Sequence, residues 1–429
     1  MANNRLAFIN GIILTGEENM TPIRNHILFT ENDRILAISP AQASTEGFEV
    51  IDLKGAYLMP GMINLHVHIP ATGKPKKKQT DARKLVRLLT STALLRKLCY
   101  RMCASYVLPE LLSGVTTIRA VGGVLDFDSR LRDDINAGKL PGPRILAANM
   151  AISVPGGHMA GSLAYEAHSA QEAAELVGKI AEGHPDLIKL MITGGVLDAV
   201  KRGEPGELKM PAEYVRAACD AAHRLGLKVA AHVESPEGIK VALRNGVDTI
   251  EHGAQPDEEM IRLFKESGAV LVNTISPALP FALFERELIG ATEVQQYNGK
   301  VLFNGIINCV RECLKAGIPV GLGTDTGCPY ITHYDMWREV YYLQKYAGVS
   351  NEFALCSATL GNARIIGMEN EIGSLAAGKC ADLIVTEENP LEDLKALRHV
   401  SMVVSRGRIV DVSGLRKYPE CERQLDRYL

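Results

Sequence analysis

The feature that most constrains the fold is an alternation of short apolar segments with amphipathic ones, which begins after residue 57. The apolar segments have the length and composition of buried strands, and there are eight of them: GMINLHVH, TTIRAVG, RILAANMAI, DLIKLMITGG, KVAAHVE, VDTIEHG, AVLVNTIS and PVGLGTD. Helical patterns lie between them, as in residues 170–183, 211–226 and 257–268. Strands that alternate with helices form a parallel sheet, and eight such units predict an α/β fold, a closed (β/α)8 TIM barrel.

A second kind of pattern flanks this region at both ends of the chain. Short β-like runs broken by Gly, Asn and Asp, such as RLAFINGIIL, occupy the first 57 residues, and similar runs return near the end as ADLIVTE and VSMVVSRGRIVDV. We expect the two flanks to pair into a small β-sandwich domain made of residues 1–57 and 376–415. Residues 58–375 then form the barrel domain.

Composition narrows the kind of protein without indicating its chemistry. The 429 residues carry a formal net charge of -3, with 46% hydrophobic and 23% charged residues, so no basic excess points to a nucleic-acid partner. No apolar run reaches the roughly 18 residues that span a bilayer, and the first residues lack the pattern of a secretory signal. The nine cysteines are scattered, which favours free thiols and a cytoplasmic location.

Side chains that can bind metals or transfer protons gather at the ends of the expected strands. His66 and His68 are two residues apart, so they share one face of their strand. His232, His252 and Asp325 stand at or near the ends of three later strands. Since the C-terminal ends of barrel strands form the active site, we expect these five residues to meet there.

Lys189 lies in the middle of the apolar run DLIKLMITGG. An unpaired ammonium is costly to bury, so a lysine in such a strand needs a partner, a modification or a route to water. The strand period places Lys189, Met191 and Thr193 on one face, which we expect to be the barrel interior. Thr193 and the glycines at 194 and 195 then form the rim of a pocket.

The chain resembles the amidohydrolase superfamily, most closely its imidazolonepropionase-like and prolidase-like branch, in the segments MPGMINLHVH, IKLMITGG, AAHVESPEG, TIEHGA, GLGTDTG and GSLAAGKCADLIV. The resemblance runs through nearly the whole chain. It implies two divalent metal ions, usually zinc. One ion is held by His66, His68 and Asp325, and the other by His232 and His252. It also implies that Lys189 reacts with carbon dioxide to give a carbamate whose two oxygens bridge the ions.

The resemblance also assigns catalytic roles. Bound metals lower the pKa of water to about 7 in favourable cases, so a hydroxide that bridges the two metals is nucleophilic near neutral pH. Asp325 is expected to orient this hydroxide and later to pass a proton to the leaving group. His158, in the flexible loop VPGGHMAG, matches a histidine that polarises the scissile carbonyl. The alternative is a loop histidine without a catalytic part.

Three further residues are expected to contact the substrate. Glu234 follows His232 by two residues, so both face the same side of their strand. Prolidase-like relatives that read a substrate carboxylate often have tyrosine at this position, in HAY where this chain has HVE. Glu234 is therefore expected to hold a cationic or hydrogen-bond-donating group, or to pair with a neighbour. Thr193 and Tyr165 lie near strand-end loops and are expected to line the pocket.

One segment, residues 74–101, departs from the charge balance of the chain. It carries ten Lys and Arg residues against the single Asp81 and follows the first expected strand. A solvated helical excursion, an oligomer contact and a lid that attracts acidic substrates or an anionic surface all suit such a charge run. Because relatives often assemble, a homo-oligomer contact is one expectation here.

The sequence therefore favours a metal-dependent amidohydrolase that cleaves an amide bond of a small molecule, such as a dipeptide or an N-acyl amino acid. Lactone or ester hydrolysis at the same two-metal site is an alternative. A single-metal deaminase is another, although such enzymes lack the lysine and commonly carry HxxE. A non-catalytic scaffold is disfavoured because all six candidate ligands are present.

Overall fold

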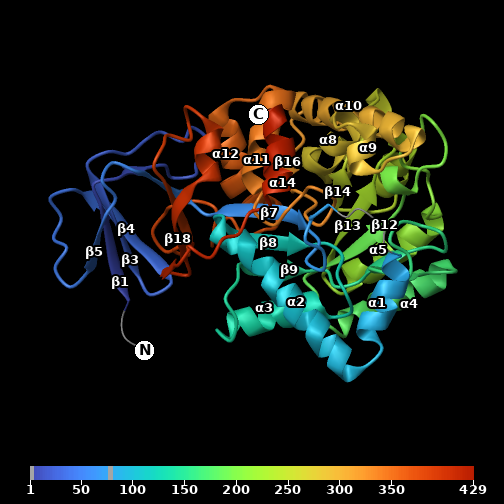
Figure 1. Ribbon diagram of the computed structural model, residues 1–429, viewed down its shortest axis with the longest axis horizontal. Helices are drawn as coiled ribbons and strands as arrows, with labels where there is room; N and C mark the ends of the chain where they lie inside the picture. Colours follow the sequence, from blue (N-terminus) through green and yellow to red (C-terminus); the bar gives the residue numbers. More distant parts are fainter. Residues whose placement is uncertain (1–3, 76–80) are drawn as a thin grey trace.

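The computed structural model describes residues 4–75 and 81–429 (Figure 1). Its largest sheet has seven strands, all paired in parallel, in the order β11-β10-β12-β13-β14-β15-β16. These strands are β10 (Ala151–Ser153), β11 (Ala164–Glu166), β12 (Leu187–Met191), β13 (Lys228–Val233), β14 (Thr249–His252), β15 (Val270–Asn273) and β16 (Val320–Leu322). A three-stranded parallel sheet contains β7 (Met62–Val67), β8 (Val115–Ala120) and β9 (Arg144–Ala147).

These two parallel sheets contain all eight strands that the sequence predicts. The third predicted strand is divided into β9 and β10, and Asn149 between them has a left-handed φ of 61°. Backbone hydrogen bonds connect the two sheets, from Asp325 N–H to the His66 carbonyl (2.9 Å) and from Asp186 N–H to the Ala147 carbonyl (2.7 Å). Within residues 4–75 and 81–429 the strand pairing does not form one continuous ring, so the closed barrel stays a prediction.

Helices follow the strands where the apolar spacing predicts them. In α4 (Ala170–Ala181), Ala173, Val177 and Ile180 are buried on one face, and the Ser169 side chain caps the start. The other α-helices after β8 are α3 (Phe127–Asn136), α5 (Ala212–Arg224), α6 (Pro236–Arg244), α7 (Glu258–Ser267), α8 (Ile275–Leu283), α9 (Arg286–Ile289), α10 (Glu293–Lys315), α11 (Met336–Tyr342), α12 (Asn351–Cys356), α13 (Asn362–Ile365) and α14 (Pro419–Leu425). Of these, α8 and α10 lie between β15 and β16 in the sequence. They pack against each other and form a wall of the cavity described below.

Two further sheets come from the flanks of the chain and lie together at one end of the molecule (Figure 1). One contains β1 (Arg5–Ile9), β3 (His26–Glu31), β4 (Arg34–Pro40) and β5 (Glu49–Asp52), and the other β2 (Ile12–Ile13), β6 (Tyr57–Pro60), β17 (Leu383–Thr386), β18 (Val400–Ser405) and β19 (Arg408–Val410). Leu6, Leu28, Leu383 and Val404 belong to one buried cluster shared by both sheets. The sheets thus share a core, while the domain boundaries at 57 and 376 remain a prediction.

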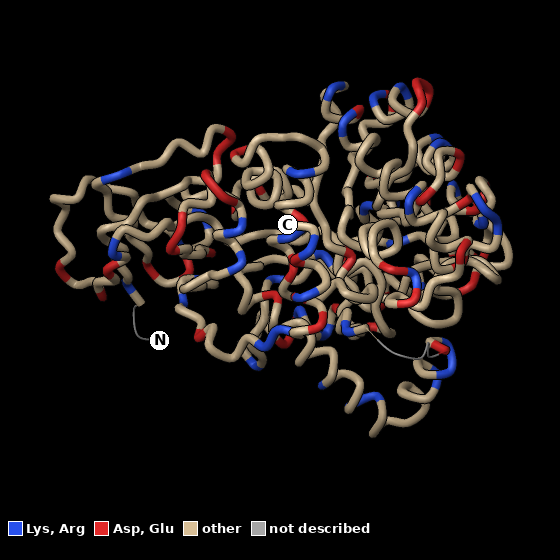
Figure 2. Tube along the Cα trace, turned by 45° about the horizontal axis from the view of Figure 1, so that its top comes forward, with Lys and Arg blue, Asp and Glu red and all other residues tan. Residues whose placement is uncertain are grey.

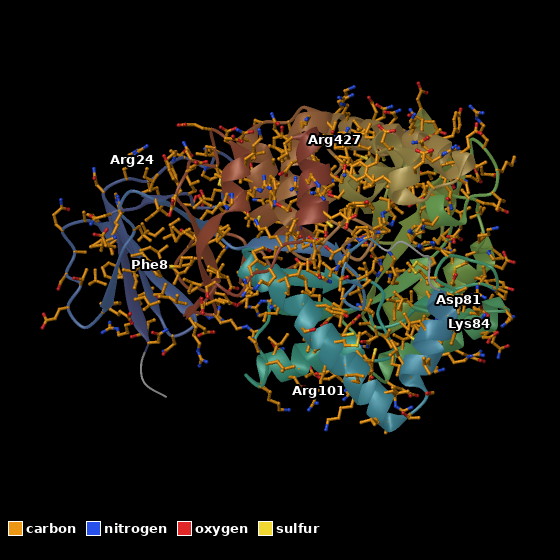
Figure 3. The ribbon with its side chains drawn as sticks, in the orientation of Figure 1. Phe8, Arg24, Asp81, Lys84, Arg101 and Arg427 are labelled. Carbon is orange, nitrogen blue, oxygen red and sulfur yellow. The ribbon has the colours of Figure 1, made fainter. Side chains whose placement is uncertain are left out.

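The predicted basic insert forms a helical hairpin of α1 (Ala82–Thr90) and α2 (Ala93–Leu112), and residues 76–80 lie outside the described residues. The hairpin stands out from the body of the molecule, with basic residues along it (Figure 2). Lys84 on α1 and Arg101 on α2 are exposed at its outside (Figure 3). No residue of α1 is buried, and Leu94 of α2 is 77% exposed. These features match an exposed helical excursion.

All nine cysteines are free thiols, as the sequence suggests. Eight of them are buried, and Cys328 is partly exposed. A helix both long and apolar enough to cross a bilayer is not found in the described part of the chain.

Candidate metal centre

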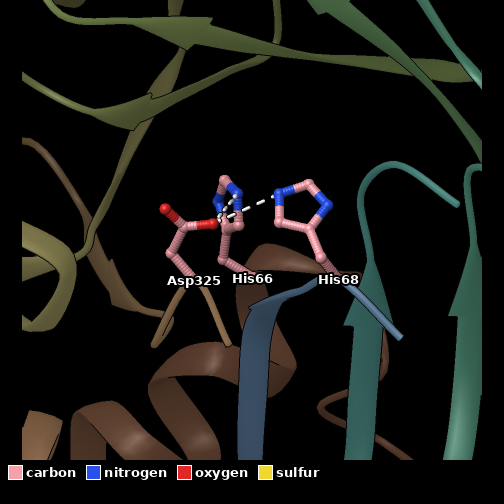
Figure 4. Close-up of side chains that lie close together, drawn as sticks. All are labelled: His66, His68 and Asp325. Atoms are coloured by element: carbon pink, nitrogen blue, oxygen red, sulfur yellow. Dashed lines mark ion pairs between the residues drawn. The ribbon is translucent and has the colours of Figure 1, made fainter. Parts of the chain in front are cut away.

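The first cluster of metal-capable side chains joins His66 and His68 on or just after β7 with Asp325, which follows β16 (Figure 4). All three residues are buried, and their ligand atoms lie within 4.8 Å of one another. Asp325 Oδ1 is 3.4 Å from His66 Nε2 and 3.2 Å from His68 Nε2. The structure therefore brings together the three residues that the sequence assigns to one ion.

The second ring nitrogen of each histidine in this cluster is held by the protein. His66 Nδ1 lies 2.8 Å from the Glu251 carboxylate, and His68 Nδ1 lies 2.9 Å from the Gly122 carbonyl. Because ionised carboxylates and carbonyls only accept hydrogen bonds, each Nδ1 carries the proton. Each Nε2 then directs a lone pair toward Asp325, which is the arrangement that a metal ligand requires.

Glu251 on β14 is itself anchored by Arg119 on β8. Arg119 Nη2 donates to both carboxylate oxygens at 2.7 Å, and the Thr249 hydroxyl donates at 2.6 Å. Burial raises the pKa of Glu251, but Arg119, the hydrogen bond from His66 and Lys189 outweigh it and hold the pKa below its ordinary value. Glu251 is therefore an ionised buried acceptor that orients His66. This role of Glu251 was not predicted from the sequence.

The second cluster contains His232 and His252, at the ends of β13 and β14. His232 Nδ1 faces His252 Nε2 at 2.8 Å. The remaining nitrogens have other partners, since His232 Nε2 lies 3.2 Å from the Gly194 carbonyl and His252 Nδ1 lies 2.7 Å from the Thr274 hydroxyl. When the Gly194 carbonyl and the Thr274 hydroxyl accept hydrogen bonds from these nitrogens, His232 Nδ1 and His252 Nε2 both present lone pairs to each other. Burial lowers the pKa of both histidines well below its ordinary value, so a metal cation suits this gap better than a proton.

Lys189 on β12 is fully buried, and its Nζ atom has no hydrogen-bond partner in the described part of the chain. It lines the same cavity as His232, His252 and Asp325. Burial lowers the pKa of Lys189 to about 8, so the neutral amine is far more abundant near pH 7 than in a solvated lysine. An unpartnered amine among metal-capable side chains fits a lysine that is chemically modified.

Two of the candidate ligands stand where the backbone turns sharply. His252 and Asp325 have left-handed φ values of 71° and 56°. Residues other than glycine seldom adopt this conformation, and those that do are enriched at functional sites. The turn at His252 has a visible consequence, because neighbouring Glu251 and His252 both reach His66. The ring centroids of His66 and His252 are 4.8 Å apart.

His158 lies in the loop after β10 and stacks on His232. The ring centroids are 4.2 Å apart and the ring planes differ by 7°. His158 Nδ1 lies 2.5 Å from Asp198 Oδ2, in the short helix η1 (Val196–Asp198). The sequence predicted His158 at the site, but Asp198 was not predicted.

Glu234 lies beside the second cluster. Its carboxylate forms a group of candidate ligands with His232 and His252, and one ligand atom from each of the three residues lies within 4.8 Å of the others. Its Oε2 atom accepts a hydrogen bond from the Val196 N–H at 3.0 Å. Burial and, to a lesser degree, Asp325 raise the pKa of Glu234 well above its ordinary value. Glu234 thus faces the site, as its spacing from His232 predicts.

The other two predicted contact residues lie outside the cavity wall as described. Thr193 is buried, and its hydroxyl donates to the Gly194 carbonyl at 2.8 Å and accepts from the Glu234 N–H at 3.0 Å. Tyr165 is half-buried, with the Lys179 ammonium 4.1 Å from its ring centroid. The structure therefore makes Thr193 a support for Glu234, and direct contact with a substrate stays a prediction for both residues.

The cavity beside the two clusters is largely apolar. Helices α8 and α10, η1 and the segment after β10 supply its apolar wall: Met159, Val196, Leu197, Pro277, Ala278, Phe281, Leu302 and Ile306. The polar groups are confined to the metal-capable residues, His158, Glu234, Thr274 and Cys328. Parallel strands whose ends gather such groups beside an apolar cavity are typical of metal-dependent hydrolases that act on small molecules.

Comparison with known proteins agrees with this class and narrows it. The profile of the Amidohydrolase family matches residues 57–410, more than half of the chain. The chain therefore belongs to the amidohydrolase family, in its prolidase-like branch. It is a hydrolase that acts on carbon–nitrogen bonds.

Similar proteins cover almost the whole chain. A Bifidobacterium longum protein described as a candidate prolidase is 34% identical, covers 99% of both chains and superimposes with a TM-score of 0.87. An Xaa-Pro dipeptidase crystallised with methionine in its active site is 29% identical, covers 95% of this chain and 100% of its own, and has a TM-score of 0.83. Ochratoxinase from Aspergillus niger is 24% identical over an alignment length of 445, and the alignment covers 96% of this chain and 88% of the relative.

Proposed function

We propose that this chain hydrolyses an amide bond in a small substrate, such as a dipeptide or an N-acyl amino acid, at a pair of divalent metal ions, most simply zinc. The observation that carries the proposal is the pair of facing nitrogens of His232 and His252 beside the unpartnered amine of Lys189. A cation between the two rings and an anionic derivative of the lysine would satisfy all three groups.

The donor set fits two such ions. His66, His68 and Asp325 would hold one ion, and His232 and His252 the other. Imidazole nitrogens and carboxylate oxygens are the ligands that zinc prefers in catalytic sites. The neutral amine of Lys189 would form a bond to the carbon of carbon dioxide and release a proton to solvent, which leaves a two-oxygen anion in place of the amine. Bound divalent ions would supply a hydroxide nucleophile at neutral pH by lowering the pKa of water.

The other steps fall to side chains of the chain itself. Asp325 would take the proton of the attacking water and pass it to the amine that leaves, so the acyl carbon gains a hydroxyl group and the amine nitrogen gains hydrogen. His158 lines the cavity and, in the form that carries hydrogen on both ring nitrogens, would donate a hydrogen bond from Nε2 to the scissile carbonyl oxygen. Glu234 would accept a hydrogen bond from a substrate N–H, and the apolar wall would receive the substrate side chain.

The relatives support the choice of an amide substrate. The two similar structures are described as a candidate prolidase and an Xaa-Pro dipeptidase. The cavity wall, among the described residues, contains no arginine and no lysine other than Lys189. A free substrate carboxylate therefore has no dedicated partner there, which agrees with HVE in place of HAY. We infer that an apolar acyl side chain matters more for binding than a terminal carboxylate.

Four wider expectations are part of the same proposal. The eight strands close into a barrel, for which the bonds that connect its two sheets are the support. Residues 1–57 and 376–415 form a separate β-sandwich domain, supported by their common core. The free thiols support a cytoplasmic location. The exposed leucines of the α1–α2 hairpin support assembly into a homo-oligomer.

The direct test is a substrate panel with the zinc-loaded protein. Dipeptides, N-acyl amino acids, aminoacyl amides and lactones are compared by kcat/KM, and the metal content is measured on the same preparation. We expect about two ions per chain and the highest kcat/KM on an amide with an apolar acyl side chain. Turnover of lactones with none of any amide would overturn the substrate class. A single ion with unmodified Lys189 would overturn the bridge.

A further inference from the structure

The ring of His158 is held on three sides. One face stacks on His232, with centroids 4.2 Å apart. A Cβ atom added at Gly195 would lie 3.2 Å from His158 Cε1, so the glycine backbone closes in on another side. The Asp198 carboxylate holds the Nδ1 edge at 2.5 Å. Such confinement leaves the ring one orientation.

In this orientation the two ring nitrogens have different environments. Nδ1 is paired with a carboxylate, which accepts its proton in a hydrogen bond. Nε2 has no hydrogen-bond partner among residues 4–75 and 81–429, and His158 lines the cavity. Because Asp198 occupies Nδ1, Nε2 is the ring nitrogen that remains available to contact a substrate.

We propose that Asp198 is a positioning residue for this reaction, which fixes the ring of His158 so that Nε2 faces the scissile carbonyl oxygen. The inference rests on the catalytic part proposed for His158. The contact between His158 and Asp198 connects two strand-end loops, because His158 follows β10 and Asp198 follows β12, 40 residues further along the chain. Misorientation of His158 should slow the chemical step more than it weakens substrate binding.

A purely structural part for Asp198 is the competing explanation. Its Oδ2 atom also accepts from the Gly195 N–H at 3.1 Å, at the start of η1. The Asp198 side chain is 43% exposed, so its removal should cost little stability. The chain offers a matched control in His223 and Asp248, a second His–Asp pair with Nε2 to Oδ2 at 2.8 Å. That pair lies at the opposite ends of the strands, since Asp248 directly precedes β14.

The experiment compares Asp198→Ala, Asp198→Asn, Asp198→Glu, His158→Ala and Asp248→Asn in the zinc-loaded enzyme. We expect Asp198→Ala and Asp198→Asn to lower kcat roughly 10- to 100-fold with a smaller change in KM, as is typical when the partner of a functional histidine is removed. Asp198→Glu should restore part of the rate. Addition of Asp198→Ala to His158→Ala should change kcat little further. Asp248→Asn should leave kcat unchanged.

A second measurement does not depend on turnover. Nitrogen-15 spectra of histidine-labelled, metal-free protein report which nitrogen of His158 carries hydrogen, with His158→Ala to identify the signal. The wild type should show a protonated Nδ1, and Asp198→Ala should lose that preference. Unchanged spectra, unchanged kcat, additive losses in the double variant or reduced metal content in Asp198→Ala would each overturn the proposal. If the wild type hydrolyses no amide or lactone, the proposed function fails, while the spectra still decide whether Asp198 fixes the ring.

Discussion

The two halves of the candidate metal centre are built differently. In the first half the Nδ1 atoms of His66 and His68 are held by Glu251 and Gly122, and both Nε2 atoms face Asp325. In the second half two histidine nitrogens face each other at 2.8 Å, and the nearby amine of Lys189 has no partner in the described residues. The first half lacks only a cation between Asp325 and the two Nε2 atoms, of which His66 Nε2 has no hydrogen-bond partner in the described residues, whereas the second half lacks both a cation and a partner for the Lys189 amine.

The two halves also differ in how the unfavourable burial of charged groups is compensated. The first half is preorganised by the buried pair of Arg119 and Glu251, whose charges compensate each other. The second half keeps a buried amine whose desolvation opposes folding. We therefore expect the first half to depend on its protein partners and the second on metal and carbamate. Each of the following changes tests one side of that contrast.

The largest effect should come from Lys189→Met, which keeps an unbranched side chain of similar length and removes the amine. Loss of the bridging anion should reduce the metal content from two ions toward one and lower kcat/KM about 10³-fold or more, equivalent to roughly 4 kcal/mol of transition-state stabilisation. The metal-free variant should be more stable than metal-free wild type by roughly 2 kcal/mol, because no charged group is buried without a partner. Metal analysis, steady-state kinetics and urea unfolding measure the three quantities.

Lys228→Met is the matched control, since Lys228 is an exposed lysine at the start of the neighbouring strand β13. It should change none of the three quantities. A Lys189→Met enzyme with two tightly held ions would show that the second half is complete without the lysine. The proposed contrast between the halves would then be lost.

Glu251→Gln should damage the first half next most strongly. The variant leaves the Arg119 guanidinium buried without a counter-charge and weakens the hold on His66 Nδ1. We expect the first ion to bind 10- to 100-fold more weakly, as in other sites that lose the partner of a ligand histidine. The free energy of unfolding should fall by about 3 kcal/mol, with or without metal. Competition with a chelator and unfolding in urea provide the two measurements.

The metal-free measurement separates the halves. Lys189→Met should stabilise the metal-free protein, whereas Glu251→Gln should destabilise it. The same direction of change for both variants would contradict the contrast. Asp248→Asn, which removes a carboxylate from an exposed histidine, controls for the loss of one negative charge.

The sequence predicted the strands and the clustering of ligands better than the contacts that hold them. The period of two in NLHVH predicted that His66 and His68 share a face, and the structure confirms that they meet at Asp325. The same period would place Glu251 and His252 on opposite faces. Both reach His66, because the left-handed backbone at His252 interrupts the alternation. A conformation set by tertiary packing cannot be read from strand periodicity.

Other residues were missed for different reasons. Arg119 lies in the apolar run TTIRAVG and is buried, so the reasoning that selected Lys189 would have selected it as well. Asp198 carries no such signal, because an aspartate in a Gly-rich loop is usually a turn residue. Its pairing with His158 depends on how two separate loops meet. Tyr165, which was expected near the pocket, has its ring against Lys179, and its contact with a substrate stays a prediction.

A pair of threonine variants gives a finer test of the same contrast. Thr274 is the contact of His252 Nδ1, so Thr274→Val removes the group that fixes that ring. We expect roughly tenfold weaker binding of the second ion. Thr249 donates to Glu251, which Arg119 already holds through both oxygens, so Thr249→Val should weaken the first ion by a smaller factor. Equal losses, measured by chelator competition, would contradict the idea that only the first half has redundant support.

The smallest effect on activity, and the clearest pH dependence, should come from Glu339. This buried carboxylate accepts hydrogen bonds from the Ile275 and Ser276 N–H groups at the start of α8, directly after Thr274. Burial raises the pKa of Glu339 from 4.5 to about 7, although these hydrogen bonds oppose the shift. The folded state therefore binds a proton that the unfolded state releases between these two values.

The sign of the pH dependence follows from that difference. The contribution of Glu339 to stability is fully present below pH 4.5 and is lost as the pH rises through 7, by about 3 kcal/mol for a shift of this size. Glu339→Gln has no such proton, so the stability of wild type minus that of the variant should fall between pH 4.5 and 7. Urea unfolding of metal-free protein at several pH values measures the difference, in which the titration of groups common to both proteins cancels. Glu258→Gln, on the exposed first turn of α7, is the control for the loss of one carboxylate. A difference that rises with pH would mean that the hydrogen bonds from α8 lower the pKa of Glu339 more than burial raises it. The buried carboxylate beside the second half would then be stabilised as fully as Glu251 is in the first.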